Sequence, residues 1–194
     1  MSSHHQALQS VLLVSSAQKG TEFLKDLLDE YDNVEITVSL NGSDTRRRVM
    51  ENTFDVILIN TPLTDEFGVD LAEHLAETTV SGIVILVRNE NYEEVSFRVL
   101  ENGIMPVAKP LHREVFYQSL NLAVATRERL RILEKENSRL KKKLDETRLV
   151  DKAKYTLMEH MNMSEAEAHR YIEKQSMDLR LSKLSVAENI LRIY

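Results

Sequence analysis

The chain has 194 residues, of which 42% are hydrophobic and 29% are charged, the composition of an ordinary globular protein. No apolar run approaches the ~20 residues of a membrane-spanning helix, and no secretory signal is visible, so we expect a cytoplasmic protein with no membrane partner. The chain has no cysteine, which excludes disulfides, iron–sulfur clusters and thiol catalysis. Residues 1–126 carry 9 Lys and Arg against 19 Asp and Glu, whereas residues 127–194 carry 16 against 12. This asymmetry predicts two modules with different partners.

Residues 10–122 alternate between short apolar runs and segments with helical spacing. Five apolar runs are predicted to be strands: residues 10–14, 34–40, 54–59, 82–87 and 104–108. Such strands, separated by helices, predict an α/β fold whose parallel sheet is covered on both faces. Ligand sites in such sheets lie beyond the carboxyl ends of the strands. The side chains at those ends are Ser15, Ser16, Asn60, Val87, Arg88 and Lys109.

The pattern over residues 10–122 resembles a response-regulator receiver domain. Its most specific matches are Gly68 and the pair Lys109-Pro110, and the segments that carry it are VLLVSS, FDVILINTPLTDEFGVDLA, GIVILV and GIMPVAKP. The resemblance implies a five-stranded parallel flavodoxin-like sheet. It also implies a phosphoryl-accepting Asp after the third strand and an acidic pair for Mg²⁺ after the first. A hydroxyl residue after the fourth strand and a Lys after the fifth contact the phosphoryl oxygens in this family.

The chain departs from this pattern at most of the functional positions. Ser15 and Ser16 stand where the acidic pair is expected, Asn60 where the phospho-acceptor is expected, and Val87 in place of the hydroxyl residue. An Asn amide cannot form an acyl phosphate, and hydroxyls replace poorly the carboxylates that Mg²⁺ prefers. The sequence therefore predicts a pseudo-receiver without phosphorylation, catalytic residues, cofactor or metal. The remaining Lys109 is expected to hydrogen-bond Asn60 or the two serine hydroxyls.

Charged side chains near this site are expected to have ordinary roles. Asp65 and Glu66 are predicted to be solvated loop acids and Asp55 an acid at a strand edge, rather than a relocated phosphorylation site. The three arginines at residues 46–48 are predicted to form the solvated face of a helix rather than a partner surface.

A long helical region follows, because the 84 residues after Pro110 contain no Gly or Pro. Its heptad seam is formed by residues that step by three and four positions: Leu130, Leu133, Asn137, Leu140 and Leu144. A single Asn at an a position favours a parallel two-stranded coil, so residues 123–147 are predicted to form a homodimer. Ala123 begins the seam as a weaker a position. The alternative is an intramolecular helix packed on the pseudo-receiver.

Residues 147–194 are predicted to form three helices, the first beginning near residue 147 and the second ending near residue 181. Ser164 and Glu167 have the spacing of a capping box, and residues 182–185 are expected to form a turn. This tail is similar to the ANTAR domain, an RNA-binding module of bacterial transcription antiterminators. The positions that match its pattern are Ala153-Lys154, Leu157-Met158, Ser164-Glu165, Ala168, Arg180 and Val186-Ala187.

The ANTAR resemblance implies a dimer that binds paired stem-loops in a leader RNA and prevents a terminator from forming. Proteins hold RNA with cations on phosphates and aromatic rings on bases. Lys154 and Arg180 are candidate contacts because they match family positions. Chemistry alone adds four candidates: Lys152, Tyr155, Arg170 and Lys183. The run at residues 141–143, three lysines, is expected to be a solvated face that adds attraction for phosphate.

Together these patterns predict a non-enzymatic RNA-binding antiterminator. The expected segments are a mobile N-terminus at residues 1–9, the pseudo-receiver at 10–122, the coil at 123–147 and the ANTAR domain at 148–194. Because the phosphorylation site is missing, a regulatory protein partner is expected to supply the signal. The alternative is a protein–protein signalling regulator whose helical tail binds a protein. DNA binding is less favoured because the tail has no recognition helix rich in Arg, Asn and Gln.

Overall fold

A computed structural model of the protein describes residues 8–31 and 33–194. Most of the segment predicted to be mobile, residues 1–7, lies outside the described residues. The chain divides into two compact units, Met1–Ile132 and Leu133–Tyr194, and each unit is described here by itself. Among the described helices, none has both the length and the apolar character needed to cross a membrane.

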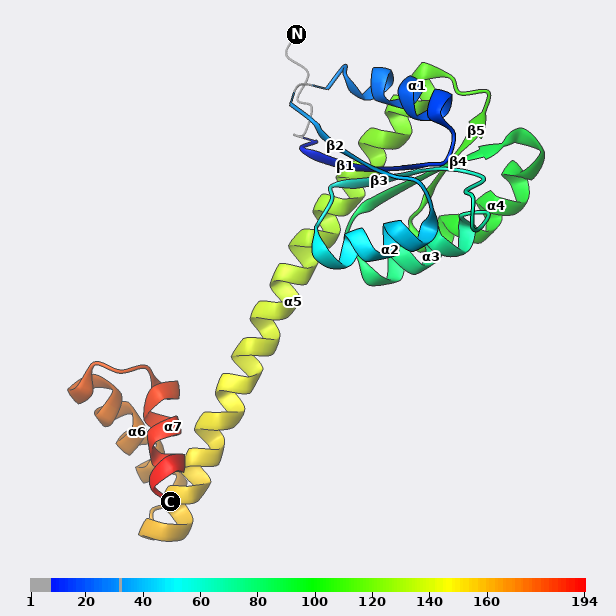
Figure 1. Ribbon diagram of the computed structural model, residues 1–194. Helices are drawn as coiled ribbons and strands as arrows, with labels where there is room; N and C mark the ends of the chain where they lie inside the picture. The colour runs from blue at the N-terminus through cyan, green and yellow to red at the C-terminus, as the bar shows by residue number, and fades with distance from the viewer. Residues whose placement is uncertain (1–7, 32) are drawn as a thin grey trace. The chain divides into compact units, whose positions relative to one another are not determined.

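The first unit is built on a five-stranded sheet in which all neighbouring strands run parallel, in the order β2-β1-β3-β4-β5 (Figure 1). The strands are β1 (Ser10–Ser15), β2 (Glu35–Ser39), β3 (Val56–Asn60), β4 (Gly82–Arg88) and β5 (Met105–Lys109). The side chains of β3 and β4 are almost all buried, as expected for strands covered on both faces. The predicted α/β class and flavodoxin-like order are confirmed.

Helices cover both faces of this sheet. They are α1 (Gln18–Leu28), α2 (Gly42–Glu51), α3 (Val69–Thr78), α4 (Tyr92–Val99) and the first part of α5 (Arg113–Met161), with short 3-10 turns at Asn89–Asn91 and Leu100–Asn102. α1 and α5 pack on one face around Leu24 and Phe116, whereas α3 and α4 pack on the other around Leu75 and Val99. These two separate cores explain why β3 and β4 are apolar along almost their whole length.

The first turns of α5 are part of the sheet core. Ala123 is fully buried, and a Cβ added to Gly82 would lie 2.4 Å from the Ala123 carbonyl oxygen, so glycine allows this close approach. Four residues later, the Arg127 guanidinium lies 2.6 Å from the Asp55 carboxylate. Residues 123–127, which the heptad pattern assigns to the coil, therefore pack within the first unit. The exposed part of the seam begins at Leu130.

The second unit contains the end of α5, α6 (Glu165–Leu179) and α7 (Lys183–Ile193). Seven side chains form its core: Ala153, Leu157, Ala168, Ile172, Val186, Ala187 and Ile190. The predicted capping box of Ser164 and Glu167 is present at the start of α6. Two boundaries differ from the sequence pattern. No helix begins near residue 147, because α5 continues through it, and Ser182 caps α7 instead of beginning a turn of four residues.

Candidate functional site

The carboxyl ends of β1 and β3 meet where a receiver would be phosphorylated. The amide of Asn60 donates to the hydroxyl of Ser15 at 3.0 Å, and the hydroxyl of Ser16 turns away to the carbonyl of Leu40 at 2.8 Å. Val87, in the place of the hydroxyl residue, is completely buried. No group of acidic or histidine side chains that could hold a metal occurs among the residues that the structure describes.

Lys109 does not contact Asn60 or the serines, which corrects the sequence expectation. Its ammonium donates instead to the backbone carbonyl of Thr61 at 2.5 Å. The side chain is half-buried, and desolvation, with a smaller contribution from the charge of Arg88, lowers the pKa of Lys109. Among the described residues, no carboxylate lies within ion-pair distance of it. Lys109 is therefore a cation without an acidic partner in this part of the structure.

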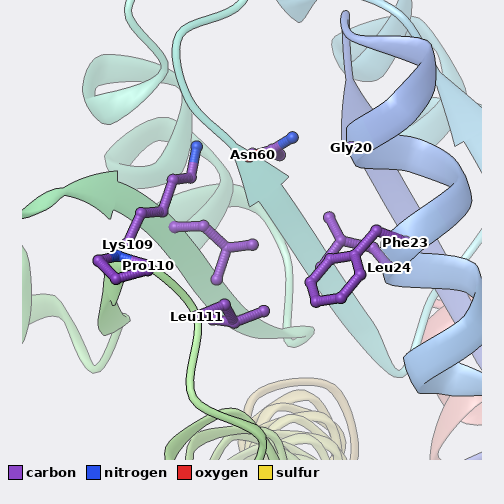
Figure 2. A pocket seen from close by; sticks show the side chains of 8 residues that line it. Gly20, Phe23, Leu24, Asn60, Lys109, Pro110 and Leu111 are labelled. Atoms are coloured by element: carbon purple, nitrogen blue, oxygen red, sulfur yellow. The ribbon is translucent and has the colours of Figure 1, made fainter.

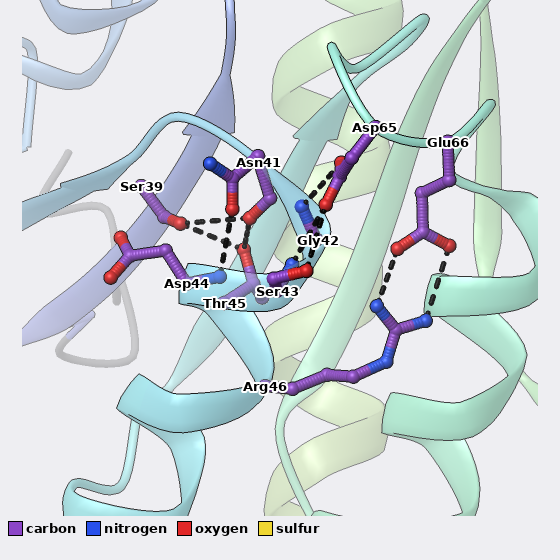
Figure 3. A network of polar contacts seen from close by, with 9 residues as sticks. All are labelled: Ser39, Asn41, Gly42, Ser43, Asp44, Thr45, Arg46, Asp65 and Glu66. Carbon is purple, nitrogen blue, oxygen red and sulfur yellow. Dashed lines mark hydrogen bonds and ion pairs between the residues drawn. The ribbon is translucent and has the colours of Figure 1, made fainter.

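The acids of the loop after β3 are engaged with α2 (Figure 3). Asp65 is exposed, as expected of a solvated loop acid, whereas Glu66 is partly buried. The Asp65 carboxylate accepts from the backbone amides of Gly42 and Ser43, at 2.9 and 3.0 Å. These bonds, with that of Gly42 the largest, lower the pKa of Asp65. Glu66 pairs with both terminal nitrogens of the Arg46 guanidinium. Both acids thus fasten the loop to the N-terminal part of α2.

The predicted dimerisation residues form an exposed stripe on α5. Leu130, Leu133, Leu140 and Leu144 are between 44% and 60% exposed, and Asn137 between them is also exposed. No other part of the described chain covers them. Apolar side chains at a and d positions are normally buried against a partner helix, so this stripe is a candidate interface.

A groove of about 430 Å³ in the second unit brings three lysines together. Lys143 and Lys154 come from α5, and Lys183 comes from the first turn of α7. The Lys154 ammonium lies 2.7 Å from the Asp151 carboxylate, which raises the pKa of Lys154, and its side chain is only 16% exposed. Lys183 contacts Glu173 at 2.6 Å. The structure therefore brings two of the six predicted RNA-binding residues to one surface.

The other four predicted RNA-binding residues do not line this groove. Lys152, Tyr155, Arg170 and Arg180 are all exposed. Arg180 ends α6 in the left-handed conformation, with φ 53° and ψ 37°. The groove also contains a residue that the sequence analysis did not select, Lys143. Its place in the lysine run at residues 141–143 was the available signal, and the run was expected to be a solvated face that adds attraction for phosphate; Lys143 is exposed.

Residues 138–191 match the family described as the ANTAR domain. This segment is an ANTAR domain. The match begins inside α5, ten residues before the predicted boundary at residue 148, so the seam residues Leu140 and Leu144 lie within it. The lysine groove lies entirely within this domain.

Longer stretches of the chain are similar to known regulators. The transcriptional regulatory protein PdtaR of Mycobacterium tuberculosis is 28% identical over 138 residues, which cover 71% of this chain and 67% of that protein. The sensory transduction protein LytR of Staphylococcus epidermidis is 28% identical over 106 residues, covering 54% of this chain and 40% of that protein. The first of these relatives is named as a transcriptional regulator and the second as a sensory transduction protein. The chain is therefore similar to regulatory and signalling proteins.

Solved structures agree on the fold of the first unit. A two-component response regulator from Clostridium difficile has a TM-score of 0.53 and 21% identity, covering 60% of this chain and 96% of that chain. A receiver domain protein from Clostridium thermocellum has a TM-score of 0.56 and 18% identity, covering 63% and 99%. At such identities the likeness establishes the receiver fold alone. The chain thus combines a receiver-like domain with an ANTAR domain.

Proposed function

We propose that this protein is a dimeric, non-enzymatic, cytoplasmic regulator that binds paired stem-loops in leader RNA and prevents a terminator from forming. The observation that carries the proposal is the groove with Lys143, Lys154 and Lys183 inside the ANTAR domain. RNA presents a phosphate on every nucleotide, and the three lysines, which line the groove together with the acids Glu146 and Asp151, offer ammonium groups to bind it.

The ion pairs in the groove are suited to exchange with phosphate. Lys183 and Glu173 are both substantially exposed, and exposed ion pairs contribute only about 0–1 kcal/mol. An RNA phosphate can therefore replace the Glu173 carboxylate at small cost. The Lys154 ammonium is less accessible and is paired with Asp151. Its proposed role is to contribute positive charge to the groove as well as to contact RNA.

The dimer is proposed to form through a parallel coiled coil of two copies of α5. The heptad spacing, the exposed leucines and the single Asn137 support a second copy of this chain as the occupant of the stripe. Two ANTAR domains in one dimer would match the two hairpins of a paired stem-loop RNA.

The receiver-like domain is proposed to act without phosphorylation. Asn60 is hydrogen-bonded to Ser15 and offers no carboxylate to a phosphodonor. We expect no added phosphate, by mass spectrometry, after incubation with acetyl phosphate. A phosphorylated peptide containing the β3–α3 loop would refute this part of the proposal. If the domain is not phosphorylated, the regulatory signal is proposed to come from a protein partner that binds this domain or α5.

RNA binding is tested with the purified full chain and a library of paired-hairpin leader RNAs. We expect salt-dependent binding to a subset of the library that DNA of equal length does not compete away. The single substitutions Lys143→Ala, Lys154→Ala and Lys183→Ala should each weaken RNA binding. Lys174→Ala is the matched control, because it removes the same charge from an exposed position of α6 outside the groove.

The second candidate function is binding of a protein by the helical tail. It is favoured by large apolar side chains that are exposed on the second unit: Tyr155, Met177, Leu179, Ile193 and Tyr194. A dimeric protein that binds no RNA in the library, together with groove variants that behave like the parent, would favour this function over antitermination.

A further inference from the structure

A second cavity lies at the degenerate receiver site, and nothing in the proposed RNA function uses it. It measures about 340 Å³, within the range of small-molecule pockets. Its lining comes from α1, from the carboxyl-terminal parts of β3, β4 and β5, and from the segment after β5: Gly20, Phe23, Leu24, Asn60, Leu86, Lys109, Pro110 and Leu111. All of these residues belong to the first unit.

The walls of this pocket are mainly apolar. Figure 2 shows the Phe23 ring and the Leu111 side chain facing each other across the hollow, with the polar ends of Lys109 and Asn60 extending at one end. The Phe23 ring is 47% exposed, so a ligand with an apolar body would remove its free surface from water. Inorganic phosphate would gain nothing from these walls.

The polar end of the pocket favours a negative charge. The Lys109 ammonium has three donors and uses one of them on the Thr61 carbonyl. It is half-buried beside Arg88, and no carboxylate pairs with it among the described residues. A bound anion would therefore offset the free-energy cost of burying the positive charge. The Asn60 amide retains a second N–H besides the one given to Ser15.

Among the described residues that line the pocket, none carries a negative charge that would repel such an anion. Ser15, Ser16 and Asn60 are neutral, and the two acids of the neighbouring loop are held by α2, Asp65 on its backbone amides and Glu66 on Arg46. A receiver with carboxylates at these positions would require a metal ion before it accepted an anion.

We propose that this pocket binds a small monocarboxylic acid with an aromatic or aliphatic body, its carboxylate on Lys109 and Asn60 and its body between Phe23 and Leu111. The proposal concerns the first unit alone and does not depend on RNA binding by the second.

The test is a titration of the full chain with 3-phenylpropionate, followed by ligand-observed NMR. We expect a Kd of about 1 mM or tighter, and binding of the neutral amide of the same acid to be weaker by about tenfold, the value of one charge-assisted hydrogen bond. Lys109→Met should lose the preference for the acid, whereas Lys109→Arg should keep it. Phe23→Ala should weaken both ligands, because it removes part of the apolar wall.

Lys19→Met is the matched control, since it removes a lysine from an exposed position of α1 outside the pocket. Circular dichroism establishes that each variant is folded. Equal binding of acid and amide, unchanged binding by Lys109→Met, or no binding by the folded parent at about 10 mM acid, well above the expected Kd, would overturn the proposal. Inorganic phosphate that binds as tightly as the acid would also overturn it, because the apolar walls would then contribute nothing.

Discussion

Asn60 illustrates how single residues decide the chemistry of this domain. Its amide occupies the end of β3 and donates to Ser15, a contact between neutral groups that requires no metal. A Cβ at Gly20 would lie 2.7 Å from the Asn60 amide nitrogen, so the glycine of α1 leaves room for this arrangement. At this scale, the end of β3 is a contact between neutral side chains, and nearby Lys109 donates to the Thr61 carbonyl.

Replacing Arg180 should separate stability from RNA binding. Arg180 adopts a left-handed conformation that glycine adopts without steric cost, so Arg180→Gly should raise the free energy of unfolding by about 1 kcal/mol. The same change removes a proposed phosphate contact and should weaken RNA binding. Chemical denaturation and RNA titration measure the two effects. Asn162→Gly, at φ 54°, is the control without a charge change and should leave RNA affinity intact. A more stable Arg180→Gly with full affinity would remove Arg180 from the RNA surface.

Asp44 should make the first unit sensitive to acid. Hydrogen bonds from Arg48 and then Arg47 lower the pKa of Asp44 from 3.8 to about 2. A carboxyl with a lowered folded-state pKa stabilises the fold above its unfolded pKa, and this contribution is lost as the pH falls from about 4 to about 2.

Asp44→Asn should therefore flatten the decrease in thermal stability of the first unit over that pH interval. High salt should reduce the difference, because these ion pairs are partly exposed. Asp26→Asn removes the same charge from an exposed position of α1 and serves as the control. Identical pH profiles for the parent and Asp44→Asn would show that the ion pairs do not stabilise the domain.

Among the elements, α5 passes through two different environments along its length. Its first turns are buried in the receiver-like core around Phe116 and Leu120, and Ala123 approaches Gly82 closely. From Leu130 onward its apolar seam is exposed. The change from buried to exposed apolar side chains within one continuous helix is the structural basis for the proposed dimer.

The seam is tested by exchanging single leucines for lysine. Leu140→Lys should weaken dimerisation at least about tenfold, because it places a charge in the seam of both copies. Ile132→Lys is the matched control, since Ile132 is similarly exposed on α5 but occupies a c position outside the seam. Sedimentation equilibrium measures both. A monomeric parent, or equal effects of the two substitutions, would contradict the coiled-coil dimer.

For the whole molecule, the proposed function predicts that dimerisation and RNA binding are linked. If each ANTAR domain of a dimer binds one hairpin, the second contact is intramolecular, and dimer loss should reduce affinity for two-hairpin RNA by about tenfold or more. Affinity for a single hairpin should change little. Leu133→Lys is the better variant here because Leu133 precedes the ANTAR match at residues 138–191, and Leu140→Lys should behave the same way. Equal losses on the two RNAs would argue against avidity.

Much of this protein was predictable from local sequence patterns. The five apolar runs predicted the parallel strands because burial on both faces demands continuous apolar side chains. Ser164 with Glu167 predicted the start of α6, since a capping box depends only on neighbouring residues. The sequence also shows directly that Asn60 itself cannot form an acyl phosphate, because its side chain is an amide; the absence of phosphorylation stays a prediction.

Tertiary structure decided the contacts between residues distant in the chain. Ala123 fits a heptad seam by spacing, yet the sheet buries it because Gly82 admits the helix backbone. Asp65 reads as a loop acid, but folding places it on the N-terminus of α2, where the backbone amides of Gly42 and Ser43 donate to its carboxylate. The groove joins Lys143 to Lys183 only because α5 and α7 pack together. Sequence spacing determines which face a side chain occupies on its own element, whereas packing determines what that face meets.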